Sequence, residues 1–156
     1  MLTDSNEKTV FAMNPLALAY LGDAVWEAFV RRRIMQTKSF GNNADKLHHE
    51  GVHYVNAGAQ AHMIHGLFDR LSESEQALVK RARNHRTATK AKNADPVDYK
   101  WATGFEALFG YWKLRGDVER IASFDREAMR VIRDHMDEIQ PKPLKETGKR
   151  ILISHD

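Results

Sequence analysis

Residues 16–33, LALAYLGDAVWEAFVRRR, form an apolar helical pattern that carries a carboxylate, Asp23, near its centre. Asn14 is a suitable N-cap and Pro15 suits the first helical position, so the helix is expected to begin there. Burying a carboxylate among apolar residues costs free energy unless a positive group meets it. A metal ion, a basic partner or solvent at the edge of the helix would each meet this requirement. One side of the helix is expected to carry four residues: Leu16, Tyr20, Asp23 and Glu27.

The rest of the chain repeats the helical period, and no alternating strand pair flanks a tight turn. Residues 1–13 read as a polar lead-in, and Gly51 is expected to bend or split the helix predicted over 44–66. The sequence therefore predicts an all-α fold of five or six helices in one domain. Four local signals mark helix ends: the capping box Ser72–Glu75, the pair Asp95-Pro96, Gly116 and Asp117. The tryptophans are expected to anchor the core or an interface: Trp26, Trp101 and Trp112.

Composition narrows the function classes. The chain of 156 residues has no cysteine, which excludes disulfides, zinc–cysteine sites and thiol nucleophiles. The N-terminus lacks the apolar core of a signal peptide, and no run approaches the length of a membrane helix. We therefore expect a soluble cytoplasmic protein without a membrane partner. The net charge of +3 is small, but the positive side chains are unevenly placed.

A second carboxylate, Glu106, lies within the apolar stretch 103–111, TGFEALFGY. Small residues flank both acids, so two helices can approach closely and bring Asp23 near Glu106. Two carboxylates in an apolar wall repel each other, and a divalent cation removes that repulsion. Mg²⁺ is commonly held by one or two carboxylates together with substrate phosphate. The alternative is that each acid pairs with an arginine, as Glu27 is expected to do with Arg31 one helical turn away.

The two motifs LALAYLGDAV and FEALFGY together resemble the catalytic domain of ribonuclease III. The similarity covers roughly residues 14–115, and the segments 80–84 and 92–95 resemble the short bacterial branch, Mini-ribonuclease III. This resemblance implies an endoribonuclease that uses Mg²⁺, with Mn²⁺ as a substitute, bound by Asp23 and Glu106. The longer enzymes carry two further acids, where this chain has Ala19 and Thr103.

Residues 80–92 hold six basic side chains and no acid. Such side chains neutralise phosphates without reading bases. Hydroxyl and amide groups among them can reach the 2′-hydroxyls of A-form RNA. The alternative is an ordinary solvated charged face. The residues expected to bind RNA are Lys80, Arg81, Arg83, Asn84, His85, Arg86, Thr87, Lys90 and Lys92.

The resemblance also implies a homodimer that cleaves double-stranded RNA. The helix over 15–35 is apolar on nearly all sides, which is consistent with cover from a second subunit. The resemblance further implies maturation of the 23S ribosomal RNA precursor, with help from a ribosomal protein. We expect a catalytic domain over 1–141 and a basic tail over 142–156, too short for the double-stranded-RNA-binding domain of the longer enzymes. Two alternatives stay open: a non-catalytic module that binds structured RNA or ribosomes, and a helical protein-interaction domain.

Overall fold

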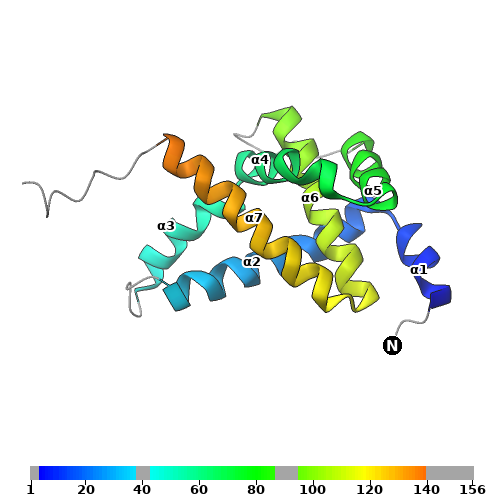
Figure 1. Ribbon diagram of the computed structural model, residues 1–156, viewed down its shortest axis with the longest axis horizontal. Helices are drawn as coiled ribbons and strands as arrows, with labels where there is room; N and C mark the ends of the chain where they lie inside the picture. Colours follow the sequence, from blue (N-terminus) through cyan, green and yellow to red (C-terminus); the bar gives the residue numbers. More distant parts are fainter. Residues whose placement is uncertain (1–3, 38–42, 87–94, 140–156) are drawn as a thin grey trace, which may run out of the picture.

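The computed structural model describes residues 4–37, 43–86 and 95–139. For residues 4–6 it describes the backbone only. The described residues form seven α-helices and one short 3₁₀ helix, and they include no strand, which confirms the all-α prediction. The number of α-helices exceeds the predicted five or six. Figure 1 shows the helices crossing one another at varied angles. The elements are α1 (Asp4–Phe11), α2 (Pro15–Thr37), α3 (Ala44–Val55), α4 (Ala57–Leu67), η1 (Phe68–Arg70), α5 (Glu73–Asn84), α6 (Pro96–Arg115) and α7 (Val118–Ile139).

The helix ends follow the local signals in the sequence. The Asn14 side chain accepts a hydrogen bond of 2.8 Å from the Leu16 amide at the start of α2. The Asp95 carboxylate accepts from the first amides of α6, and Gly116 ends that helix in the left-handed region with φ of 71°. Asp117 accepts from the Arg120 amide at the start of α7. The predicted caps are therefore confirmed, because side-chain acceptors satisfy amides that have no partner within the helix.

Two predicted features differ from the structure. The lead-in contains a helix, α1, although its sequence carries little apolar periodicity. The segment 44–66 does contain a break, but it falls at Asn56 and not at Gly51, which lies inside α3. Asn56 ends α3 and begins α4, because its amide donates to the Val52 carbonyl while its side chain accepts from the Ala59 amide. A single residue that caps both helices thus decides the break, rather than the flexibility of glycine.

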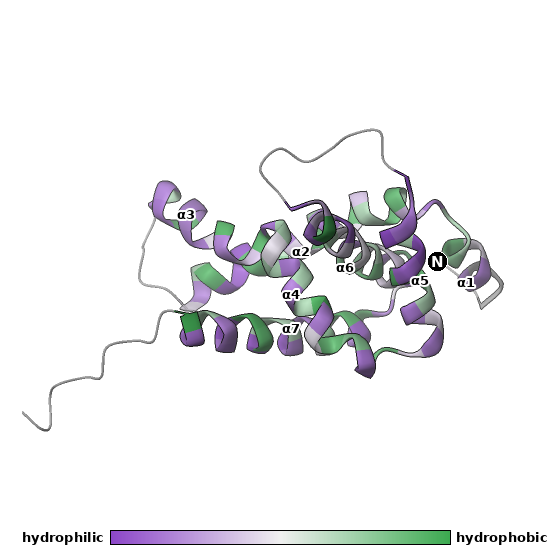
Figure 2. Cartoon of the chain, turned by 90° about the horizontal axis from the view of Figure 1, so that it is seen from above, coloured by the Kyte–Doolittle hydropathy of each residue, from purple (hydrophilic) through white to green (hydrophobic). Residues whose placement is uncertain are grey.

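Helix α6 occupies the centre, and α2, α4 and α5 pack most extensively against it. The core around it is aromatic and fully buried. The ring centres of Trp26 and Phe105 lie 5.0 Å apart, and those of Trp112 and Phe124 also lie 5.0 Å apart. In Figure 2 hydrophobic and hydrophilic residues alternate along α7, as they do in a helix with one face on a core. Trp26 and Trp112 are confirmed as core residues, whereas Trp101 is half-buried.

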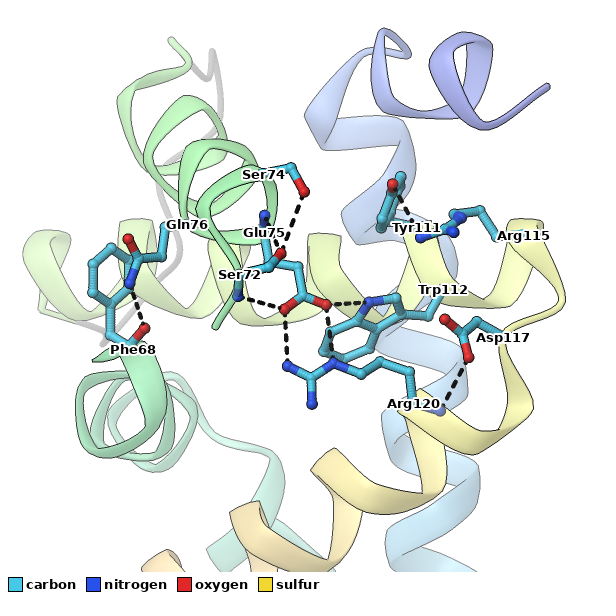
Figure 3. A network of polar contacts seen from close by, with 10 residues as sticks. All are labelled: Phe68, Ser72, Ser74, Glu75, Gln76, Tyr111, Trp112, Arg115, Asp117 and Arg120. Carbon is cyan, nitrogen blue, oxygen red and sulfur yellow. Dashed lines mark hydrogen bonds and ion pairs between the residues drawn. The ribbon is translucent and has the colours of Figure 1, made fainter. Parts of the chain in front are cut away.

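A buried polar network joins α5, α6 and α7 (Figure 3). Glu75 completes the predicted capping box with Ser72 and also accepts hydrogen bonds from two more distant side chains. The Trp112 indole donates at 2.9 Å, and the Arg120 guanidinium donates twice, at 2.9 and 2.8 Å. Burial favours the protonated Glu75 carboxyl, but the hydrogen bonds from Arg120 and Ser72 outweigh it and lower its pKa. Glu75 is therefore a charged group with a complete set of partners.

Among the described residues no helix is both long and apolar enough to span a bilayer. The predicted boundary between the domain and the basic tail, at residues 141 and 142, lies outside the described residues.

Candidate active site

The site is built where α2 and α6 cross in direct backbone contact near the middle of the molecule (Figure 1). A Cβ atom on Gly22 would lie 1.6 Å from the carbonyl oxygen of Glu106. A Cβ atom on Gly110 would lie 1.9 Å from the carbonyl oxygen of Leu18. No side chain fits at either position, so the predicted close approach of the two helices is confirmed.

This crossing brings the carboxyl groups of Asp23 and Glu106 together. Asp23 follows Gly22 on the exposed edge of α2, and Glu106 is only partly exposed on α6. Burial, the charge of Asp23, a hydrogen bond with Asp23 and the charge of Glu27 together raise the pKa of the Glu106 carboxyl to about 9. Glu106 therefore holds a proton at neutral pH when no cation is bound. The alternative was that each acid pairs with an arginine. Glu106 instead forms a hydrogen bond with Asp23, so the alternative is wrong for Glu106.

The donor set at this crossing suits a hard divalent cation. Two carboxylates that share a proton exchange it readily for a cation, since either one relieves their repulsion. The described residues contain no group of three or more His, Cys, Asp or Glu side chains placed to hold a metal ion. A cation at Asp23 and Glu106 would thus keep most of its coordination positions for water or substrate phosphate. Mg²⁺ is typically bound in this way.

The longer enzymes carry two further acids at positions where this chain has Ala19 and Thr103, and these two residues have structural roles here. Ala19 is buried in α2. Thr103 is buried in α6, and its hydroxyl donates a hydrogen bond of 2.9 Å to the Tyr99 carbonyl. Neither residue supplies a carboxylate beside Asp23.

The basic segment is described only up to Arg86, so Thr87, Lys90 and Lys92 lie outside the described residues. Arg81 is engaged within the protein, which the sequence did not reveal. Its guanidinium donates hydrogen bonds to the carbonyls of Phe11 and Met13 and lies 4.9 Å from the centre of the Phe11 ring. Arg81 therefore ties α5 to the connection between α1 and α2.

The other described residues of the segment are more open to solvent. Lys80, Asn84 and Arg86 are exposed, whereas Arg83 and His85 are half-buried. The Arg83 guanidinium lies 4.8 Å from the centre of the Trp101 ring, which positions it on the surface shared by α5 and α6. This arrangement leaves Lys80 on α5, part of Arg83, and Arg86 just beyond the helix accessible to a phosphate backbone.

Sequence reasoning assigned Glu27 only to an ion pair. The pair is present, with 3.5 Å between the Arg31 Nη2 and the Glu27 carboxylate. The charge of Glu27 also acts on the Glu106 carboxyl. The spacing of four residues from Asp23 was the available signal, because it places both acids on one side of α2.

A model of the ribonuclease III domain matches residues 16–117, which contain both helices of this crossing. The chain belongs to the ribonuclease III domain family. The matched region runs from α2 to the end of α6, so the fold and the two acidic motifs both fall within the family's domain.

Individual relatives support the same assignment. The chain is 47% identical over 108 residues to a Mini-ribonuclease 3 from Symbiobacterium thermophilum, covering 69% of this chain and 82% of that protein. A Mini-ribonuclease 3 from Thermoanaerobacter is 40% identical over 125 residues, covering 80% and 87%. A crystal structure of a protein from Fusobacterium nucleatum superposes with a TM-score of 0.67 at 29% identity, covering 76% and 93%. The resemblance to the short branch of ribonuclease III is thus confirmed, and the protein is an endoribonuclease of that type.

Proposed function

We propose that the protein is a Mg²⁺-dependent endoribonuclease that cleaves double-stranded RNA, with Asp23 and Glu106 as its metal-binding catalytic residues. The observation that carries this proposal is the pair of adjacent carboxyl groups at the α2–α6 crossing, where the described side chains that act on Glu106 are the acids Asp23 and Glu27. A bound Mg²⁺, or Mn²⁺ in its place, would activate water and stabilise charge on the leaving oxygen.

The residues of the chain itself hold and expose this site. The backbone contact at Gly22 fixes the distance between the two helices, and the exposed position of Asp23 leaves the acid pair open to a phosphodiester. Replacing the Glu106 proton by a cation converts both acids into anionic ligands. The chain would then present oxygen ligands on one side of the ion and leave the other side to RNA.

We further propose that exposed cations on α5 and just beyond its C-terminal end bind the RNA backbone. Lys80 and Arg86 are exposed, and Arg83 is held against Trp101 with part of its surface open. Asn84, His85, Thr87, Lys90 and Lys92 complete the proposed RNA-binding segment. Arg81 has its own partners within the protein, so its main contribution is to hold the segment in place.

A homodimer is the assembly that we propose for cleavage of both strands. Tyr20 on α2 is 86% exposed, and it lies one turn before Asp23. Further along α2, a cleft is lined mainly by Ala24, Val25, Ala28 and Phe29. A second copy of the chain would cover these apolar residues, as expected for a helix that is apolar on several sides. It would also supply a second acid pair for the opposite strand.

In the cell we propose maturation of the 23S ribosomal RNA precursor in the cytoplasm, with a ribosomal protein as an assisting partner. The support for this role is the membership of the chain in the short branch of the family. A structured precursor RNA contains duplex segments, whose phosphates could contact the exposed cations on α5 and just beyond it.

Cleavage of a duplex RNA by the wild type and by Asp23→Asn and Glu106→Gln tests the proposed activity. Each variant is expected to lose cleavage by about 10³-fold or more, since a metal supplies several kcal/mol of charge stabilisation. Glu73→Gln is the matched control, because Glu73 is an exposed acid on α5. Duplex binding without cleavage by the wild type, in Mg²⁺ and in Mn²⁺, would instead support a non-catalytic RNA-binding module.

Salt dependence of duplex binding tests the basic segment. Neutralising Arg83, Arg86 and Lys90 together is expected to lower the slope of log K against log salt by up to about three, or roughly one for each lost phosphate contact. Arg130→Gln, an exposed change on α7, is the control. An unchanged slope in the triple variant would remove the segment from the RNA-binding surface.

A further inference from the structure

Glu27 lies one helical turn beyond Asp23 on α2, on the same side of the helix. It is not a freely solvated surface acid, because its side chain is 38% exposed. Its negative charge adds to those effects that favour the protonated Glu106 carboxyl, after burial and the contact with Asp23. Glu27 therefore faces the acid pair closely enough to affect it.

The ion pair of Glu27 with Arg31 is weak. The closest atoms lie 3.5 Å apart, and the Arg31 side chain is 72% exposed. Exposed pairs of this kind contribute little to stability, with a median between about 0 and 1 kcal/mol. Arg31 can thus hold the Glu27 carboxylate near the site and still release it to another partner.

Open space adjoins this carboxylate. Glu27 and Arg31 line one end of a cleft of about 270 Å³ between α2 and α3, whose walls are mainly apolar. Neither Asp23 nor Glu106 lines this cleft, so it shows only that the side of Glu27 toward α3 borders open space and is not packed against protein atoms.

Direct binding of one cation by Asp23, Glu106 and Glu27 is not what the structure supports. The described residues hold no cluster of three such side chains placed around a metal position. Mg²⁺ keeps several of its waters in proteins, and acceptors in the outer shell orient those waters. A carboxylate one turn from a metal-binding aspartate is well placed for that outer shell.

We infer that Glu27 is a positioning residue that accepts a hydrogen bond from a water on the cation held by Asp23 and Glu106. This inference rests on the proposed function. It also gives the site a third negative group, although the positions of Ala19 and Thr103 provide none. Arg31 then serves to hold Glu27 in the free protein and to release it when the cation binds.

Binding of Mn²⁺ alone to the protein, measured by electron paramagnetic resonance without RNA, tests the inference. Glu27→Gln is expected to weaken Mn²⁺ binding roughly tenfold, at the lower end of the effect of removing an outer-shell partner. Arg31→Gln is the matched control: it breaks the same ion pair but keeps the carboxylate, so its affinity should equal or exceed that of the wild type. If Arg31→Gln weakens Mn²⁺ binding as much as Glu27→Gln, the ion pair is the cause and the inference is wrong.

Cleavage kinetics separate a positioning role from a structural one. Glu27→Gln should need about tenfold more Mg²⁺ for half-maximal cleavage, yet approach the wild-type rate at saturating Mg²⁺. Unchanged Mn²⁺ affinity in Glu27→Gln, with loss in Asp23→Asn, would overturn the inference and leave the proposed function standing. Mn²⁺ binding that survives Asp23→Asn would overturn both.

Discussion

Glu75 and Glu106 are both shielded from water, but their pKa values shift in opposite directions. Glu75 accepts hydrogen bonds from Trp112 and Arg120, and these partners keep its pKa low. Glu106 meets Asp23 instead, and its pKa rises to about 9. Burial acts in the same direction on both carboxyl groups, so the difference lies in the partner. Glu75, which is paired with a cationic side chain, is part of the fold, whereas Glu106, which is paired with another acid, belongs to the site that we propose binds a metal cation.

The largest effect is expected from a substitution that separates α2 from α6, because the contact between these helices brings Asp23 and Glu106 together. Gly22→Ala places a Cβ atom 1.6 Å from the Glu106 carbonyl oxygen, where only backbone can move. We expect the free energy of unfolding to fall by about 3 kcal/mol or more, as for severe overpacking. Urea denaturation measures this loss.

Gly51→Ala is the matched control for that substitution. Its Cβ atom would lie 3.7 Å from the Ile34 Cδ1 atom, an ordinary contact inside α3. Because alanine favours helix over glycine, this variant should gain up to about 1 kcal/mol. A loss at Gly51 that equals the loss at Gly22 would show that the α2–α6 contact is not special.

Glu75→Gln tests the paired acid. It leaves the Arg120 guanidinium without its counter-charge in a partly buried position. We expect the free energy of unfolding to fall by roughly 2 kcal/mol, less than for a fully buried pair because Arg120 keeps some contact with water. Glu73→Gln, an exposed change in the same turn of α5, should be nearly neutral in the same urea titration. Equal effects of the two variants would contradict a structural role for the network.

The pH dependence of stability should have opposite signs at the two glutamates. The pKa of Glu106 is higher in the folded protein than the unfolded value of 4.5, so its contribution is complete below that value and declines as the pH rises toward 9. Without divalent metal, stability should fall by up to about 1.4 kcal/mol per pH unit in this window, and Glu106→Gln should remove that fall. The lowered pKa of Glu75 predicts the reverse, stability that is lost only when acid protonates it. Urea midpoints in EDTA from pH 5 to 8 measure the slope, and an equal slope in wild type and Glu106→Gln would contradict the raised pKa.

Local features of the fold could be predicted from the sequence because single residues decide them. Asn14, Ser72, Asp95 and Gly116 mark helix ends by short-range hydrogen bonds or backbone geometry. The glycines around the two acids likewise predicted a close crossing. A helix cap depends on residues that are neighbours in the chain, and the close crossing depends on two short motifs. Both can be recognised directly in the sequence.

Tertiary partners were not predictable in the same way. Glu75 was recognised as part of a capping box, but its bonds to Trp112 and Arg120 join residues 37 and 45 positions apart. Arg81 was counted with the RNA-binding cations, although its guanidinium contacts the Phe11 carbonyl 70 positions away. The sequence does not show whether a long basic side chain contacts solvent, RNA or a backbone carbonyl. Only the folded structure distinguishes these cases.

The double cap at Asn56 has a consequence for how the chain can change in length. A single residue ends α3 and begins α4, so no spare residue between them could absorb an insertion. One added residue in a helix turns everything beyond it by about 100°, given 3.6 residues per turn. Met63 and Ile64, both fully buried, would then rotate away from the core. The junction between α3 and α4 should therefore tolerate substitution far better than it tolerates insertion or deletion.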